Sequence, residues 1–145
     1  MLLGVVAYII GVRLGQPAEQ VSTFGEPPSS GQAVIPLPEI QRVGLKDAKA
    51  AYDIGNAIFL DVRDTDSYAA SHIPGSINIP EGDISTRLQE LNPDQWIITV
   101  CTWPAEESSA RAAKVLQENG FSKVQALQGG LQAWADAGYP IGSEW

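Results

Sequence analysis

Two short apolar runs constrain the fold of this chain more than any other feature of its sequence. The runs AIFLDV, residues 57–62, and WIITV, residues 96–100, show no alternation of polar and apolar positions. Such runs are typical of strands in a parallel sheet that is covered on both faces. Segments rich in helix-forming residues lie between and beside them. This order predicts an α/β domain in which right-handed crossovers join parallel strands.

Turn residues and helix propensity predict the remaining elements. Gly55 ends a segment rich in helix formers, Pro80 ends a short strand, and Asn119-Gly120 closes a longer helix. Strands are expected at 40–43, 57–62, 76–79, 96–100 and 124–127, and helices at 45–54, 64–71, 84–91, 106–118 and 131–137.

The chain begins with an apolar segment that has no charged side chain before Arg13. Its first 12 residues would form a helix too short for a hydrocarbon core of about 30 Å, which needs about 20 residues. Three interpretations remain open: a transmembrane helix whose upstream part is missing, the apolar core of a signal peptide, or a helix that packs on a partner or in the membrane interface. We expect membrane association through this segment, with the extracytoplasmic side preferred.

The 145 residues divide into three parts by composition. Residues 1–15 are the apolar segment, which we expect to be a membrane anchor or a partner-packing helix. Residues 16–38 contain Pro-Pro, Ser-Ser-Gly and three more prolines without a sustained period, so they are expected to form a linker. Residues 39–145 carry the alternating pattern and are long enough to bury a core.

Charge and residue counts limit the chemistry that the domain can perform. The chain has a net charge of −8, which argues against nucleic acid as a partner. One cysteine and one histidine exclude an internal disulfide and leave too few soft ligands for a zinc or iron site. We expect neither a metal nor a cofactor.

Cys101 directly follows the buried run WIITV and precedes a short loop, residues 102–105, and a helix. Ligands of open parallel sheets bind beyond the carboxyl ends of the strands. The N–H groups of the loop and of the helix N-terminus would form an anion cradle that lowers the pKa of the thiol below about 8.5. A thiolate there can take sulfur from a donor and hold it as a persulfide. Alternatively, a cysteine at this place is a small buried apolar residue.

Two further motifs carry a resemblance to a known family. Asp61-Val-Arg63, followed by Tyr68 and by His72-Ile-Pro-Gly-Ser76, is similar to the first signature of rhodanese-like sulfurtransferase domains. Residues 127–131 (LQGGL), with Trp134 and Gly138-Tyr-Pro140, resemble their C-terminal signature. The resemblance covers residues 39–141 and places Cys101 where the family carries its active cysteine. It implies a five-stranded parallel sheet with helices on both faces and transfer of sulfane sulfur through a persulfide.

The loop after Cys101 departs from the commonest form of that family. It resembles a subgroup with the pattern Cys-x-Cys-Pro-x-Glu-x-Ser-Ser-Ala-Arg, but Trp103 replaces the second cysteine, which excludes a dithiol mechanism. Ser108 stands where many relatives have arginine, which argues against a phosphatase. Besides catalytic Cys101, we expect substrate contacts from nine residues: Thr102, Trp103, Pro104, Ala105, Glu106, Glu107, Ser108, Ser109 and Arg111.

Two functional hypotheses follow. In the first, the protein is a sulfurtransferase whose partner is a small sulfur donor or a protein persulfide. In the second, it is a non-catalytic rhodanese-like subunit of a membrane-associated assembly, bound through residues 1–15. Glu106 and Glu107 serve as helix-capping charges in either case, but carboxylates that faced the pocket would oppose an anionic donor such as thiosulfate. Arg111 would then reach the cradle or pair with Glu107.

Overall fold

A computed structural model describes residues 35–102 and 106–144 of the chain. The predicted apolar segment, the predicted linker up to residue 34 and loop residues 103–105 lie outside these described residues. No helix within the described ranges combines the length and apolar character needed to cross a bilayer.

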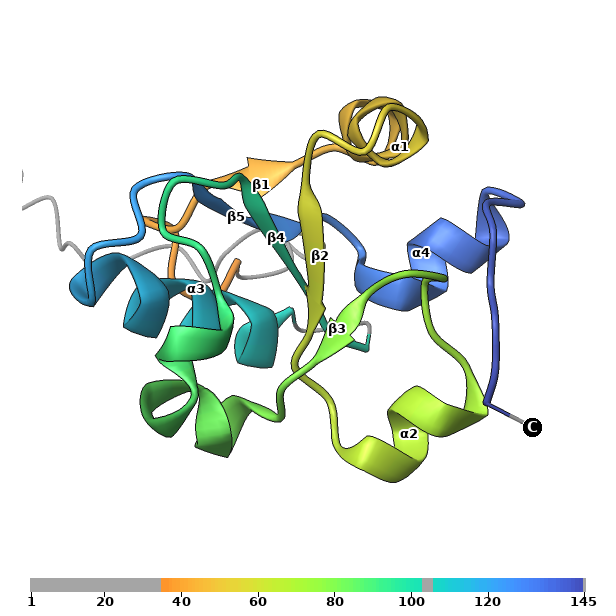
Figure 1. Ribbon diagram of the computed structural model, residues 1–145. Coiled ribbons are helices and arrows are strands. Elements are labelled where there is room, and N and C mark those ends of the chain that lie inside the picture. The colour runs from red at the N-terminus through yellow and green to blue at the C-terminus, as the bar shows by residue number, and fades with distance from the viewer. Residues whose placement is uncertain (1–34, 103–105, 145) are drawn as a thin grey trace, which may run out of the picture. The chain divides into compact units, whose positions relative to one another are not determined.

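Five parallel strands form one sheet in the order β1-β5-β4-β2-β3 (Figure 1). Their bounds are Arg42–Val43 for β1, Ile58–Asp61 for β2, Ile77–Asn78 for β3, Ile97–Val100 for β4 and Val124–Leu127 for β5. The two apolar runs of the sequence, β2 and β4, are neighbours near the centre of the sheet. The predicted five-stranded parallel sheet is confirmed.

Helices cover both faces of the sheet, as the sequence predicted (Figure 1). Successive side chains of a strand point to opposite faces, and in β2 Leu60 packs toward α3 (Glu107–Glu118). Phe59 packs on the other face, toward α1 (Leu45–Asp53) and α4 (Gly130–Asp136). Because both faces are covered, the central strands are apolar on both sides except at Asp61 and Thr99, which explains their nearly continuous runs.

The segment expected to be a helix at 84–91 forms two 3₁₀ turns instead. They are η1, Glu81–Thr86, and η2, Leu88–Glu90. Arg87 lies between them with φ −122° and ψ 19°, so the α-helical hydrogen bonds cannot continue through it. Ile84 is the buried residue of the first turn and packs under α3, so one apolar anchor rather than a helical stripe positions this segment.

The signature residues near the C-terminus serve the core. Trp134 of α4 is fully buried, and its indole N–H donates to the Pro140 carbonyl at 2.8 Å. Its ring makes edge contacts with Phe59, Tyr52 and Tyr139 at centroid distances of 5.0–5.5 Å. These contacts fix α4 against β2 and α1, and so fix the turn before α4 that reaches the candidate site.

Candidate active site around Cys101

Cys101 lies at the carboxyl end of β4, between the ends of β2 and β5. Its carbonyl accepts a hydrogen bond from Leu131 N at 2.8 Å, which joins it to the start of α4. The residue is 3% exposed and borders a cavity of about 350 Å³. The lining residues are Arg63, Asp64, Ser67, Cys101, Thr102, Glu106, Glu107 and Ser108.

The Cys101 thiol is held by one side chain of α3. Its Sγ donates to Ser109 Oγ at 3.2 Å, and Ser109 Oγ donates in turn to the Glu106 carbonyl at 2.9 Å. The Ser109 carbonyl accepts from Thr99 Oγ1 at 2.8 Å, so β4 fixes the same residue from below. Ser109 thus faces the thiol with a lone pair, since its proton is engaged elsewhere.

The predicted depression of the Cys101 pKa is wrong for this state of the site. Burial raises the pKa of the thiol above its ordinary value, and the carboxylates of Glu106 and Asp61 raise it further. The hydrogen bonds from Ser109 act in the opposite direction and lower it. Because the sulfur is nearly inaccessible, desolvation of the thiolate raises the pKa by more than the hydrogen bonds from one hydroxyl and one N–H lower it.

Asp61 and Arg63 form a buried pair at the end of β2. Arg63 Nη2 lies 2.7 Å from Asp61 Oδ2, and Arg63 Nε donates to Asp61 Oδ1 at 3.0 Å. Arg63 Nη2 also donates to the Ser71 carbonyl at 2.6 Å, and Asp61 is 1% exposed. The pair joins β2 to the end of α2 (Thr65–Ala70) and leaves the Arg63 side chain as part of the cavity wall.

Glu106 is bound on the side of the loop that faces β1 and β5. Its Oε2 lies 3.2 Å from Nε of Arg42 in β1, and its Oε1 accepts from the backbone N–H of Gly129. The side chain is only 14% exposed. Its φ of 46° is left-handed, a conformation that a residue other than glycine adopts at a cost. The carboxylate therefore does more than cap the helix, because it joins the loop after Cys101 to β1 and to the turn before α4.

Glu107 and Arg111 lie on the outer side of the same helix. Arg111 Nη1 lies 2.5 Å from Glu107 Oε1, and Arg111 Nε lies 2.5 Å from Glu81 Oε1. Arg111 Nη2 also donates to Ser108 Oγ at 3.3 Å. The hydrogen bond from Arg111 holds the pKa of Glu81 below its usual range. Arg111 was expected either to reach the cradle or to pair with Glu107. The structure has the pair with Glu107, and Glu81 is a second partner.

The structure gathers most of the expected loop residues that it describes. Thr102, Glu106, Glu107 and Ser108 line the cavity with Cys101, Ser109 contacts the sulfur, and Arg111 is outside the lining set. Trp103, Pro104 and Ala105 lie outside the described residues, and with them the middle of the expected N–H cradle.

Sequence reasoning missed Arg63, Asp64 and Ser67 as cavity walls and Arg42 as a partner of the loop. The first three follow β2, so their position beyond a buried strand was a usable signal. Asp64 caps α2 by accepting from Ser67 N at 2.9 Å and from Ser67 Oγ at 2.7 Å. These hydrogen bonds lower the pKa of the Asp64 carboxyl, so it is charged at neutral pH.

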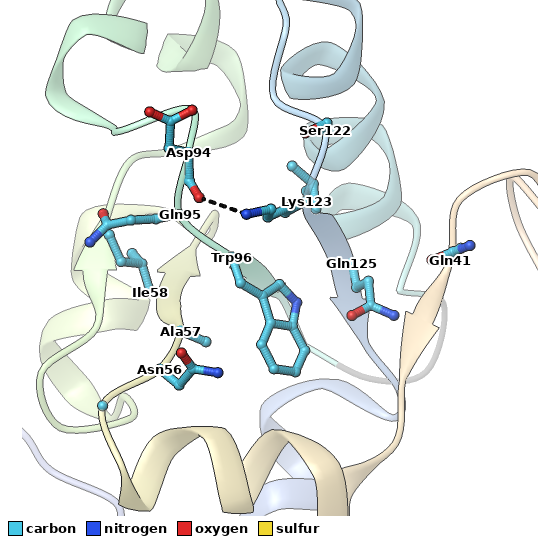
Figure 2. A pocket seen from close by; sticks show the side chains of 12 residues that line it. Gln41, Asn56, Ala57, Ile58, Asp94, Gln95, Trp96, Ser122, Lys123 and Gln125 are labelled. Atoms are coloured by element: carbon cyan, nitrogen blue, oxygen red, sulfur yellow. Dashed lines mark hydrogen bonds between the residues drawn. The ribbon is translucent and has the colours of Figure 1, made fainter.

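A larger pocket, of about 650 Å³, lies at the opposite end of the strands, where β2, β4 and β5 begin (Figure 2). Trp96 lies in its middle, with the side chains of Gln41, Asn56, Gln95 and Gln125 around it (Figure 2). Its lining residues supply one cation, Lys123, and one carboxylate, Asp94, but no thiol or imidazole. The smaller cavity, which Cys101 borders, is therefore the candidate site. In the described part of the chain, no three His, Cys, Asp or Glu side chains lie close enough to hold a metal ion.

Comparison with known proteins agrees with this arrangement of strand, cysteine and helix. The sequence description of the rhodanese-like domain matches residues 45–137, which is more than half of the chain. The chain belongs to the rhodanese-like domain family. The match includes Cys101, the Asp61-Arg63 pair and the Gly129-Gly130 turn.

Two curated relatives share this rhodanese-like region. YrkF of Bacillus subtilis (strain 168), which carries the provisional name of a sulfur carrier protein, is 32% identical over 111 residues, or 76% of this chain. The HTH-type transcriptional regulator Rv0324 of Mycobacterium tuberculosis is 34% identical over 89 residues, or 61% of this chain. The chain spans 56% and 39% of the lengths of these two proteins.

Solved rhodanese-like structures superpose on the same region. The BH2092 protein of Bacillus halodurans has a TM-score of 0.65 at 29% identity, with 72% of this chain and 77% of that chain covered. A rhodanese-related protein of Thermoplasma volcanium has a TM-score of 0.64 at 26% identity, with 70% and 97% covered. A human single-domain sulfurtransferase has a TM-score of 0.61 at 20% identity, with 66% and 95% covered, and so shares the fold.

Proposed function

We propose that this protein is a sulfurtransferase in which Cys101 carries sulfane sulfur as a persulfide. The observation that carries the proposal is the position of Cys101. It is the free cysteine at the carboxyl end of a central strand, bordering a cavity, with the Ser109 hydroxyl on its sulfur. Membership of the rhodanese-like family and the similarity to a protein named as a sulfur carrier support sulfur transfer in general.

The charges around the cavity favour an uncharged or protein-bound persulfide as the donor. Three carboxylates, on Asp64, Glu106 and Glu107, and one guanidinium, on Arg63, line it. The loop residues outside the described part, Trp103 to Ala105, carry no charged side chain. A dianion such as thiosulfate would enter against this balance, while a persulfide that reacts in its neutral form would not.

Sulfur uptake from such a donor needs no outside oxidant or reductant. The Cys101 sulfur, after losing its proton, attacks the outer sulfur of a donor R–S–SH and forms a new S–S bond. The donor S–S bond breaks with its electron pair on R–S⁻, which takes up a proton and leaves as R–SH. The products are Cys101–S–SH and R–SH, so atoms and oxidation states balance. An acceptor such as cyanide then removes the outer sulfur as thiocyanate and restores the thiol.

Ser109 supplies the group that this reaction needs at the sulfur. When Cys101 loses its proton, the Ser109 hydroxyl can turn its hydrogen from the Glu106 carbonyl, 2.9 Å away, to Sγ, 3.2 Å away. A hydrogen bond to the charged form of a thiol favours that form. Ser109 thereby offsets part of the desolvation that opposes a buried thiolate.

Intact-protein mass spectrometry after brief exposure to a low-molecular-weight persulfide tests the proposal. We expect the parent protein to gain one sulfur atom that cyanide removes, and the Cys101→Ser variant to gain none. Thiosulfate in place of the persulfide is expected to load sulfur more slowly. A folded parent protein that gains no sulfur from either donor would overturn the proposal.

A further inference from the structure

Arg42 binds an unusually large number of acceptors for a residue of a two-residue edge strand. Its Nε donates to the Glu106 carboxylate at 3.2 Å, and its Nη1 donates to the carbonyls of Leu37 and Ile40 at 2.8 and 2.5 Å. Its Nη2 donates to the Pro36 carbonyl. The side chain is 12% exposed, so these hydrogen bonds replace water. This guanidinium joins the start of the domain to the loop that follows Cys101.

Glu106 carries that connection to the nucleophile. Its carboxylate binds Arg42 on one oxygen and the Gly129 N–H on the other, while its carbonyl accepts the Ser109 hydroxyl. Ser109 Oγ in turn accepts from Cys101 Sγ at 3.2 Å. An unbroken path of two side chains and one backbone carbonyl therefore leads from Arg42 to the reactive sulfur.

The third member of the contact, Gly129, has no freedom to follow a displaced glutamate. Its φ is 77°, and a Cβ added there would lie 2.4 Å from Ala133 Cβ. Only glycine therefore fits here, and its carbonyl accepts from Ala133 N at 3.2 Å, which holds the residue at the start of α4. Without Arg42, one carboxylate oxygen would lose its cation, and the left-handed conformation of Glu106, at φ 46°, would lose part of what holds it.

We propose that Arg42 is a positioning residue for sulfur transfer, holding Glu106 so that the Ser109 hydroxyl lies against Cys101 Sγ. This inference rests on the proposed function and names a residue outside the cavity lining, 59 positions before the cysteine in sequence. Arg42 also compensates the Glu106 charge, which otherwise opposes ionisation of the thiol. The side chain of a distant edge strand thus influences the reactivity of the central strand.

Two readouts on the full chain test this inference. The first is the rate at which Cys101 takes up sulfur from the low-molecular-weight persulfide, followed by mass spectrometry. The second is the pH dependence of iodoacetamide alkylation of Cys101, its sole target thiol. Alkylation reports on the thiol whether or not sulfur is transferred, so failure of the proposed function and failure of this inference are distinguishable.

Arg42→Gln is expected to slow sulfur uptake by roughly tenfold, because a reacting group that is held less well in position reacts more slowly. The same variant should move the inflection of the alkylation curve to higher pH. Arg42→Lys should lie between this variant and the parent, because a single ammonium replaces a forked donor. The double variant Arg42→Gln/Glu106→Gln should recover most of the rate, since it removes the uncompensated charge and keeps an acceptor for Gly129 N–H.

Arg87→Gln is the matched control. It removes an exposed guanidinium paired with Glu90 between η1 and η2, away from the cavity lining, and should leave both readouts unchanged. All variants are compared at a temperature where circular dichroism shows them folded. An Arg42→Gln variant that melts earlier but keeps the parent alkylation profile and sulfur uptake would overturn the positioning role. So would a variant that matches the parent in every measurement.

Discussion

The first turn of α3 has two faces, and they treat adjacent residues of the same kind differently. Glu106 and Ser109 face inward, where they bind Arg42, the Gly129 N–H and the Cys101 sulfur. Glu107 and Ser108 lie on the more exposed side, at the rim of the cavity, where both contact Arg111 and Ser108 also hydrogen-bonds to Glu81. Side chains three and four positions apart share one face of a helix, which brings Ser109 beneath Glu106 and brings Arg111 to both Glu107 and Ser108. The comparison shows that the role of each polar residue near the nucleophile depends on its face and not on its chemical type.

The largest expected difference between the faces is in stability. Glu106→Ala should lower the free energy of unfolding by about 2–4 kcal/mol, because it leaves a nearly buried guanidinium and a backbone N–H without their acceptor. Urea denaturation followed by circular dichroism measures the change. Glu106→Gln, which keeps an acceptor, serves as the control and should cost less. A loss below about 0.5 kcal/mol for the alanine variant would place the carboxylate in solvent and remove the contrast.

The next largest effect separates the two serines through the reactivity of Cys101. The pKa of the parent thiol is raised by burial, so alkylation should increase with pH and reach its midpoint above about 8.5. Ser109→Ala removes the side-chain hydrogen bond that lowers that pKa, keeps the backbone one, and should shift the midpoint further upward. Ser108→Ala, on the outer face, should leave it in place. Equal midpoints for the two alanine variants would show that Ser109 does not act on the sulfur.

A smaller effect concerns the outer ion pairs in acid. The pKa of Glu81 is lowered in the folded state, mainly by its hydrogen bond to Arg111. The resulting stability is present above the unfolded-state pKa, about 4.3, and is lost as the pH falls through the lower folded-state pKa. Arg111→Gln should therefore lower the melting temperature at pH 7 by a little and leave it unchanged near pH 2. A deficit that persists in acid would mean that packing of the Arg111 side chain matters more than its charge.

The smallest effect is expected for Glu107, whose side chain is 56% exposed. Glu107→Gln should change the free energy of unfolding by less than about 0.5 kcal/mol, and this change should vanish in high salt. Carboxylates that faced the pocket were expected to oppose thiosulfate, and the structure limits the size of that effect. Glu106 is compensated by Arg42, and solvent screens Glu107, so we now expect about twofold at most from Glu107→Gln at physiological salt. A thiosulfate:cyanide assay measures it, and a tenfold rise would mean that solvent does not screen the Glu107 charge from the cavity.

Several parts of the fold and site could be read from local sequence. The run at 96–100 and the helix formers after residue 106 place Cys101 at a strand end before a helix, where the structure has it. The segment at 84–91 was misjudged because its helix formers do not reveal that Arg87 leaves the helical region. The pKa of the thiol was misjudged because the loop suggests N–H donors, while burial to 3% exposure is a property of the packed domain.

By itself, the sequence determined the class of fold, the order of the strands and main helices, and the strand that Cys101 follows. These depend on periodicity and turn residues, which act over a few neighbouring positions. Only the tertiary structure decided that Arg42 meets Glu106, 64 positions later, and that Glu106 faces inward while Glu107 faces outward. The physical reason is that such contacts depend on the order and register of the strands. β1, from the start of the domain sequence, pairs with β5, from near its end. That pairing brings Arg42 beside the loop that follows β4.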